Sequence, residues 1–257
     1  MEIRKLNAAR GWTWVKQGWQ LIMHNPLLAI SLALVGAFGM FLAFHIPMFG
    51  PLLAVLLMPV LMAGYMRVCR ALEENEEVEL TQLIAGFDKH TMPLISIGGF
   101  MMMGLLIVSM TVIFIGGDAL ATLLENFKAS NDPQILVDAM QAAGSGVALG
   151  LLVGFTMMFA LMLALQYAPM LVFFSDVPPL AALRASFAGS LRNIVPYTVY
   201  SLIMQGAALV LGIVPFGLGM IVLLPLGLTS LYVSYRNIFP FPDELTPGQH
   251  TKIDTEA

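Results

Sequence analysis

The residue types that most often bind metal ions occur in this chain without the spacing of a metal site. There are 4 histidines and 1 cysteine, Cys69, so the chain cannot form an intrachain disulfide. The 19 methionines include the groups 101–103 and 157–158, and thioethers can bind Cu(I). Consecutive residues point around a helix, however, and methionine commonly fills gaps in apolar packing. We therefore expect no metal and no cofactor, with a copper route as the less favoured alternative.

The sequence also lacks the motifs of common catalytic sites. It contains no P-loop, no HExxH and no Ser–His–Asp order, so we expect that the protein is not an enzyme. The deeper polar residues of its long apolar runs are neutral, and they include Gln166 and Gln205. These two amides either bond to neighbouring helices or contact a substrate. An ion-driven transporter usually needs a carboxylate within the membrane, and the absence of one from the middle of these runs disfavours that class.

The composition indicates a membrane protein built from apolar helices. Of the 257 residues, 58% are hydrophobic and only 11% are charged, whereas soluble domains carry about 25% charged residues. A helix needs about 20 mostly apolar residues to cross a bilayer. Six runs meet this requirement, at about 26–46, 51–69, 92–116, 144–174, 195–214 and 217–238. We predict one all-α integral membrane domain over residues 1–240 and a disordered cytoplasmic tail at 241–257. The net charge of -4 disfavours a nucleic acid as a partner.

The basic residues predict how the chain is oriented. Lys128 lies in the loop 117–143, whereas the others of the 12 Lys and Arg fall in the termini or in the loops on the opposite side. Segments rich in Lys and Arg remain in the cytoplasm. We therefore expect a bacterial inner-membrane protein with both termini in the cytoplasm and the loop 117–143 outside.

All three tryptophans, Trp12, Trp14 and Trp19, lie in one short segment before the first span. On a helical wheel Trp12 and Trp19 share a face with Ile22, and polar and basic residues occupy the opposite face. Tryptophan prefers the headgroup layer of a bilayer. We predict an amphipathic helix that lies flat on the cytoplasmic leaflet, with the tryptophans as interfacial anchors. A docking surface for a protein partner is the alternative.

The same plan recurs before spans three and five. Segments 80–87 and 180–194 each carry an apolar helical face, with Phe87 and Phe187 as further anchors. A proline also lies inside the returning span of each hairpin, at Pro59, Pro169 and Pro225. The pattern predicts three hairpins, each preceded by a cytoplasmic amphipathic helix, that form a pseudo-threefold repeat with three kinks. The kinks either shape a cavity that opens toward the cytoplasm or only relieve packing strain.

Glycines mark a packing face at the start of span four. Gly146, Gly150 and Gly154 form two overlapping GxxxG motifs, which allow another helix to approach closely. The neighbour is either a helix of the same chain or a second copy in a homodimer.

Charged residues concentrate in "EENEEVE", residues 73–79. We interpret this run as a solvated loop, with a basic partner or a cation as the alternative. In the loop 117–143, Asp118 and Asp132 are predicted to cap two short helices.

The opening "ARGWTWVKQGW" and the close "LYVSYRNIF" resemble an uncharacterised family of bacterial six-helix inner-membrane proteins. More distantly, the plan of hairpins with amphipathic helices is similar to the membrane domains attached to some glycerophosphodiester phosphodiesterases. Neither resemblance implies a catalytic residue.

The sequence favours a protein that binds or positions a lipid-like or apolar molecule, or that serves as an accessory of envelope machinery. Its partners would be the lipid bilayer, a bound lipid and a second copy or another protein. A small-solute transporter or channel and a membrane scaffold are the alternatives.

Overall fold

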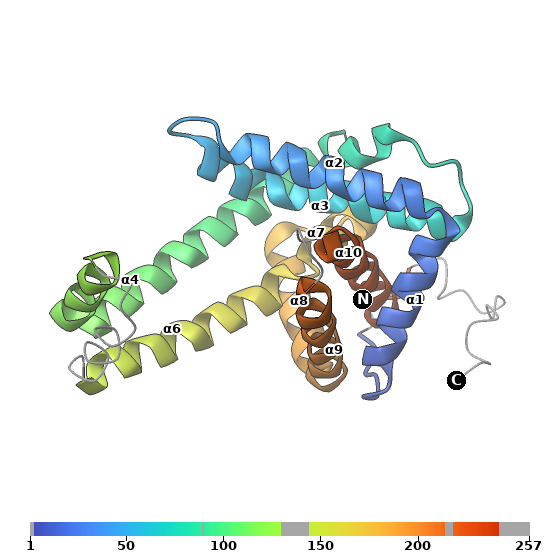
Figure 1. The fold of residues 1–257 in the computed structure, drawn as a ribbon. Coiled ribbons are helices and arrows are strands. Elements are labelled where there is room, and N and C mark those ends of the chain that lie inside the picture. Colours follow the sequence, from blue (N-terminus) through green and yellow to red (C-terminus); the bar gives the residue numbers. More distant parts are fainter. Residues whose placement is uncertain (1–2, 89, 130–143, 214–217, 242–257) are drawn as a thin grey trace. The chain divides into compact units, whose positions relative to one another are not determined.

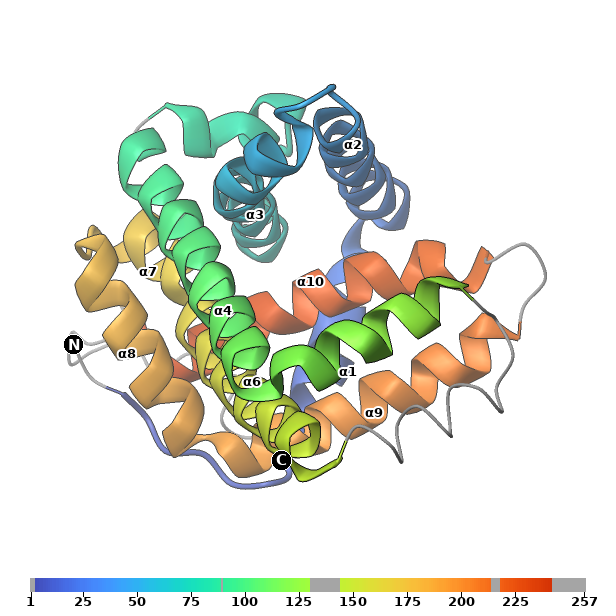
Figure 2. The same cartoon turned by 90° about the vertical axis from the view of Figure 1, so that its left-hand side faces the viewer.

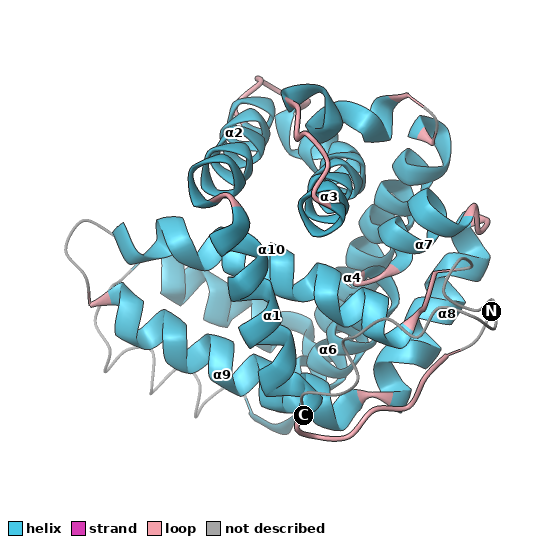
Figure 3. Ribbon diagram, turned by 90° about the vertical axis from the view of Figure 1, so that its right-hand side faces the viewer, coloured by secondary structure: helices cyan, strands magenta, loops and turns pink. Residues whose placement is uncertain are grey.

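A computed structural model describes residues 3–88, 90–129, 144–213 and 218–241, and the regular elements in these ranges are all helices (Figure 3). Figure 1 shows them coloured along the chain. Their bounds are α1 (Arg10–His24), α2 (Pro26–Phe44), α3 (Gly50–Glu74), the 3₁₀ helix η1 (Leu80–Phe87), α4 (Thr91–Ala129), α6 (Gly144–Leu165), α7 (Ala168–Ser175), α8 (Pro179–Arg192), α9 (Ile194–Gly212) and α10 (Leu218–Ile238). The predicted helix after Asp132 and the predicted disordered tail from 242 onward lie outside the described residues.

Within the described ranges, six helical segments are long and apolar enough to cross a bilayer, which confirms the predicted all-α membrane fold. They are Pro26–Phe44, Gly50–Glu74, Thr91–Thr122, Gly144–Ser175, Ile194–Gly212 and Gly219–Ile238. The second continues beyond its predicted end at residue 69. Asn75 ends that helix in the left-handed conformation, with a φ of 54°. The last turn therefore carries charged residues beyond the apolar part of the span.

Contacts within the chain define two compact units. The first comprises the described parts of Met1–Gly98 and Ala164–Ala257, and the second comprises Gly99–Leu163. The expected single domain over 1–240 stays a prediction. In the first unit α1 packs on α9 and α10, α2 packs on α3, and α7 packs on α8. Figures 2 and 3 show α9 and α10 side by side.

The α2–α3 hairpin has the short turn that its prolines and glycine predict. The side chain of Asn25 caps α2 by accepting a hydrogen bond of 3.2 Å from the Leu28 backbone N–H. Met48 makes the turn between the helices with a φ of 65°. The Tyr65 hydroxyl then donates a hydrogen bond of 3.1 Å to the Ala29 carbonyl and joins the two helices. This bond satisfies a buried hydroxyl, which would otherwise be costly in an apolar surrounding.

Segment Leu80–Phe87 differs from the predicted amphipathic α-helix. It is a 3₁₀ helix, in which three residues complete a turn, so Leu83 and Gly86 share one side. Both are buried against α3. The Leu83 carbonyl lies directly over Gly64, and Gly86 lies over the Val60 carbonyl, so a side chain at either glycine would overlap backbone atoms. Close backbone contacts at Gly64 and at Gly86 therefore place this segment on α3, and an amphipathic helical face does not.

The predicted glycine face of span four packs within the second unit. Gly150 and Gly154 lie against Val112 of α4, and Gly146 lies against Ile115 of the same helix. A Cβ atom on Gly150 would come within 3.2 Å of the Val112 carbonyl oxygen. The glycine face thus has an internal neighbour, as the first of the two predicted alternatives requires.

Helix α4 is interrupted at the predicted end of span three. Gly117 has a φ of 54° and a ψ of -149°, which lie outside the helical region and which glycine adopts most readily. The chain then resumes a helix up to Ala129. Asp118 begins that second part, and its predicted role as a helix cap stays a prediction.

The three internal prolines take two different positions. Pro59 and Pro225 lie inside α3 and α10, whereas Pro169 lies in the first turn of α7. Gln166 and Tyr167 separate α6 from α7. The predicted kink at Pro169 is therefore a full break, because proline has no N–H and is best tolerated where a helix begins.

Candidate functional site

The three tryptophans of α1 have different surroundings. Trp14 is fully buried, and its ring centroid lies 6.2 Å from that of Tyr200 on α9. Trp12 and Trp19 remain 57% and 44% exposed. Trp14 is therefore a packing residue, and its prediction as an interfacial anchor is wrong. Anchoring by Trp12 and Trp19 stays a prediction.

Two glycines let the packed face of α1, which also carries Trp14 and Ile22, approach its neighbours closely. Gly11 lies against the backbone of α9 at Pro196, and Gly18 lies against α10 at Ser230. A side chain at either glycine would overlap backbone atoms of the neighbouring helix. In a bilayer, apolar side chains that face lipid cost no hydration free energy. Interfaces between helices are therefore enriched in small residues, which permit close approach.

Helix α8 follows the same rule. Its buried positions are small, Ala182, Ser186, Gly189 and Ser190. Its large apolar side chains, such as Phe187 and Leu191, are exposed. Phe87, the last residue of η1, is exposed as well. These positions suit contact with lipid, but anchoring by Phe87 and Phe187 stays a prediction.

Helix α8 also satisfies a backbone group that the break in span four leaves free. The freed backbone N–H of Tyr167 donates a hydrogen bond of 3.0 Å to the Ser186 hydroxyl. The Tyr167 hydroxyl lies 3.0 Å from the hydroxyl of Ser234 on α10. Broken helices are tolerated at membrane depth only where neighbours satisfy the freed backbone groups. Ser186 supplies this for the Tyr167 N–H, and Ser234 contacts the tyrosine hydroxyl. Both were missed from the sequence because they are far from residue 167.

A groove with a volume of about 610 Å³ lies beside this break, along α9 and α10. Its lining residues are Gln166, Tyr197, Tyr200, Met220, Leu223, Leu224, Gly227, Leu228 and Leu231. Most of the lining is aliphatic, and the polar groups are one amide and two tyrosine hydroxyls. Binding pockets for small molecules are typically about 300–1,000 Å³ and mainly apolar with a few polar groups. The groove has these properties.

The two predicted intramembrane amides lie in different places. Gln166 contributes to the groove, whereas Gln205 is exposed on α9 and is not part of the lining. The Gln166 amide nitrogen is buried and has no hydrogen-bond partner among the described residues. It lies near the Tyr167 hydroxyl without meeting hydrogen-bond geometry.

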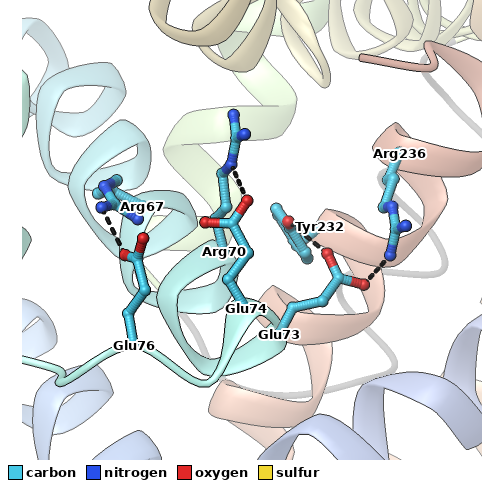
Figure 4. Close-up of polar contacts among 7 residues, drawn as sticks. All are labelled: Arg67, Arg70, Glu73, Glu74, Glu76, Tyr232 and Arg236. Carbon is cyan, nitrogen blue, oxygen red and sulfur yellow. Dashed lines mark hydrogen bonds and ion pairs between the residues drawn. The ribbon is translucent and has the colours of Figure 1, made fainter. Parts of the chain in front are cut away.

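Charged residues join the C-terminal ends of α3 and α10 (Figure 4). Glu73 forms an ion pair with Arg236 and accepts a hydrogen bond of 2.8 Å from the Tyr232 hydroxyl. Arg70 pairs with Glu74 at 2.8 Å. The Arg70 guanidinium also lies 4.4 Å from the centre of the Phe241 ring, which is a cation–π distance.

Glu74, Glu76, Glu77 and Glu79 are exposed, as the interpretation of residues 73–79 as a solvated run requires, and the ion pairs add detail to it. Glu73 and Glu74 are paired as above, and Glu76 pairs with Arg67 at 2.8 Å. Glu77 and Glu79 border a separate hollow of about 520 Å³ next to the end of α1. Glu73 therefore ties α3 to α10, whereas Glu74 and Glu76 pair with arginines of α3 itself. Glu76 borders the hollow as well.

One buried histidine joins two distant segments. His90 lies just before α4 and is 7% exposed, and its Nε2 atom is 2.6 Å from a carboxylate oxygen of Asp176, just after α7. The residues are 86 positions apart in the chain, so no spacing signal indicated the pair. Among the described residues, no group of three or more His, Cys, Asp and Glu is placed to hold a metal ion.

The N-terminal segment is fixed to the junction of α8 and α9 by Asn193. Its side-chain oxygen accepts a hydrogen bond of 2.8 Å from the Leu6 N–H, and its amide nitrogen donates one of 2.9 Å to the Arg4 carbonyl. Asn193 is 1% exposed. Residues 4–6 thus lie against the start of α9.

Six apolar spans, helix interfaces made of small residues and a groove open along two spans define a multi-pass α-helical membrane protein. A curated protein of Burkholderia thailandensis, named "Probable inner membrane protein", is 30% identical over 265 residues, which cover 93% of this chain and 94% of that protein. This chain belongs to the same family of inner-membrane proteins. No known family profile and no solved structure matches it.

Proposed function

We propose that this protein binds a lipid-like molecule in the groove between α9 and α10. The observation that carries the proposal is the groove itself, with a volume of about 610 Å³ and an aliphatic lining. Binding and positioning of the molecule need no catalytic step, so the proposed activity is not enzymatic. An accessory role in envelope machinery fits the same binding activity.

The groove has the direction and length of an acyl chain. It follows α10 from Met220 to Leu231, which is about 16 Å for a helix that rises 1.5 Å per residue. Its tyrosines lie in the first turns of α9, near the end of the span where lipid ester groups are found. Only 6% of the α9 span is buried inside the protein, so lipid can reach the groove from the side.

Both termini are proposed to be cytoplasmic. The support is the predicted placement of every Lys and Arg except Lys128 on one side. Arg70 on α3 and Arg236 on α10 belong to this set, and their clusters at the ends of the two helices fit one common side. The groove would then open beside the cytoplasmic leaflet at Tyr197.

The distant similarity in plan to membrane domains of glycerophosphodiester phosphodiesterases, and the three-hairpin repeat, stay predictions.

Native mass spectrometry in a mild detergent tests the binding proposal. We expect the purified full chain to retain one lipid. Gly227→Leu should remove it, because Gly227 lines the groove and the nearest atom to an added Cβ is the end of the Met204 side chain, 3.8 Å away. The matched control is Gly206→Leu on α9, where an added Cβ meets nothing within 4 Å. This control should retain the lipid.

Two results would overturn the proposal. One is a natural chain that carries no lipid under conditions in which it remains folded by circular dichroism. The other is equal lipid retention by the Gly227→Leu and Gly206→Leu variants.

A further inference from the structure

We infer that the bound molecule is an anionic phospholipid, whose phosphate group is held by cations gathered at the first turn of α9. This inference rests on the proposed binding of a lipid in the groove and names the class of that lipid. The cations are Arg4, Arg10 and Arg192.

Three separate parts of the chain place the backbones of these arginines at the first turn of α9. Asn193 holds the Arg4 carbonyl at 2.9 Å, and Arg192 is its neighbour in sequence. The Arg4 N–H also donates a hydrogen bond of 3.0 Å to the carbonyl of Ile238, at the end of α10. These backbone bonds fix the position of Arg4 even though its side chain is exposed.

Arg10 reaches the same place from α1. The next residue, Gly11, lies so close to the Pro196 carbonyl that no side chain would fit. Pro196 belongs to the first turn of α9. The backbone of Arg10 is therefore held next to the turn that Arg192 precedes and Asn193 caps.

The charges of these cations are not neutralised within the described part of the chain. Arg67, Arg70 and Arg236 each pair with a glutamate. Arg4, Arg10 and Arg192, by contrast, form no ion pair with a described carboxylate. Guanidinium groups bind phosphate oxygens through paired N–H donors, so they are suited to a phosphate headgroup. Basic pockets beside membrane helices recognise anionic lipids in this way.

The groove begins one helical turn from this cluster. The Tyr197 N–H donates a hydrogen bond of 3.1 Å to the Asn193 carbonyl, and the Tyr197 side chain lines the groove. A phospholipid with its phosphate at the cations would pass its ester groups beside Tyr197 and place an acyl chain along α10. The surface is thus continuous from a cationic end to an apolar end, which matches an anionic phospholipid.

The test compares two lipids with the same acyl chains. The full-length protein is mixed in mild detergent with equal amounts of dioleoyl phosphatidylglycerol and dioleoyl phosphatidylcholine, and native mass spectrometry measures each complex. We expect phosphatidylglycerol to predominate. The double variant R4Q/R192Q should lower that preference roughly thirtyfold, as expected for the loss of two interfacial cations. It should still bind phosphatidylcholine.

The charge-matched control is K16Q/R184Q. Both residues are exposed, and neither belongs to the first turn of α9. This variant should keep the preference of the natural protein. An equal loss in both double variants would show a general charge effect and overturn the inference. Displacement of phosphatidylglycerol by an equal concentration of inorganic phosphate would also overturn it, because the site would then bind a free anion.

Failure of this inference is distinguishable from failure of the proposed function. If the natural protein binds both lipids equally and Gly227→Leu removes both, the groove binds lipid without selecting the headgroup, and the inference is wrong. If neither lipid is retained, the proposed function is wrong as well.

Discussion

The carboxylate of Glu73 on α3 accepts a hydrogen bond of 2.8 Å from the hydroxyl of Tyr232 on α10 and pairs with Arg236 one turn further along (Figure 4). Glu73 and Tyr232 are 159 positions apart in the chain. Side-chain exposures of 29% for Glu73 and 20% for Arg236 place the pair between a surface and a buried ion pair. The contact holds together the ends of two spans beside the groove.

Glu73→Gln should destabilise the protein. Hydrogen bonds that involve a charged group contribute about 1.5–3 kcal/mol, and the amide retains only part of this interaction. The measurement is thermal unfolding followed with a thiol-reactive fluorophore, because the single cysteine, Cys69, is buried in the folded protein and becomes reactive on unfolding. The control is Glu77→Gln, at an exposed glutamate outside this cluster. Equal unfolding temperatures for the two variants would contradict the structural role of Glu73.

Gly64→Ala should destabilise the docking of η1 on α3. The added methyl group would overlap the Leu83 carbonyl, and overpacking of this kind costs about 1–3 kcal/mol or more. Gly39→Ala on α2 is the matched control, since an added Cβ there meets nothing within 4 Å. That control should be neutral or stabilising, because alanine is favoured over glycine in a helix by about 1 kcal/mol. A Gly64→Ala variant as stable as Gly39→Ala would show that the close contact is absent.

The tryptophans can be tested one at a time by replacing two of them with phenylalanine. In liposomes that contain brominated phospholipid, we expect strong quenching of Trp12 and Trp19 and weak quenching of Trp14, which is fully buried. Trp14→Ala should also destabilise the fold by about 3–5 kcal/mol, the usual loss for a buried aromatic residue. Strong quenching of Trp14 would mean that α1 does not pack on α9.

The orientation of the chain can be tested with engineered cysteines. The buried Cys69 gives a low background for labelling. In intact spheroplasts a membrane-impermeant maleimide should label Lys128→Cys and leave Lys16→Cys and Arg184→Cys unlabelled, and lysis should expose the latter two. The opposite pattern would contradict the asymmetry of positive charge on which the proposed orientation depends.

Run length and hydropathy were sufficient to predict the spans. The first was predicted at 26–46 and is observed at Pro26–Phe44, because a helix that crosses lipid must be long, apolar and internally hydrogen bonded. The glycine face at Gly150 was also predictable, since small residues at a spacing of four allow another helix to pack closely. These features are local, so the sequence alone reveals them.

The buried faces of the outer helices were not predictable by the same reasoning. A helical wheel grouped Trp12 and Trp19 with Ile22, but Ile22 is buried together with Trp14, whereas Trp12 and Trp19 are exposed. In lipid, a large apolar side chain is stable on the outside, so hydrophobicity does not tell the protein side of a helix from the lipid side.

Long-range polar pairs were equally inaccessible. His90 with Asp176, and Asn193 with the backbone of Leu6, join residues whose separation in the chain carries no signal. The groove follows from the position of α9 against α10 and from the break at Gln166, which only the three-dimensional arrangement reveals.

The most direct test of lipid binding in the groove is photocrosslinking in a bilayer with a phospholipid that carries a diazirine in its acyl chain. We expect mass spectrometry to place the label on residues 220–231 of α10 and on Tyr200, at a yield well above that at the exposed Leu209 of α9. The Gly227→Leu variant should abolish this excess labelling. Labelling spread evenly over the exposed apolar residues of α9 and α10, and unchanged by Gly227→Leu, would contradict the account.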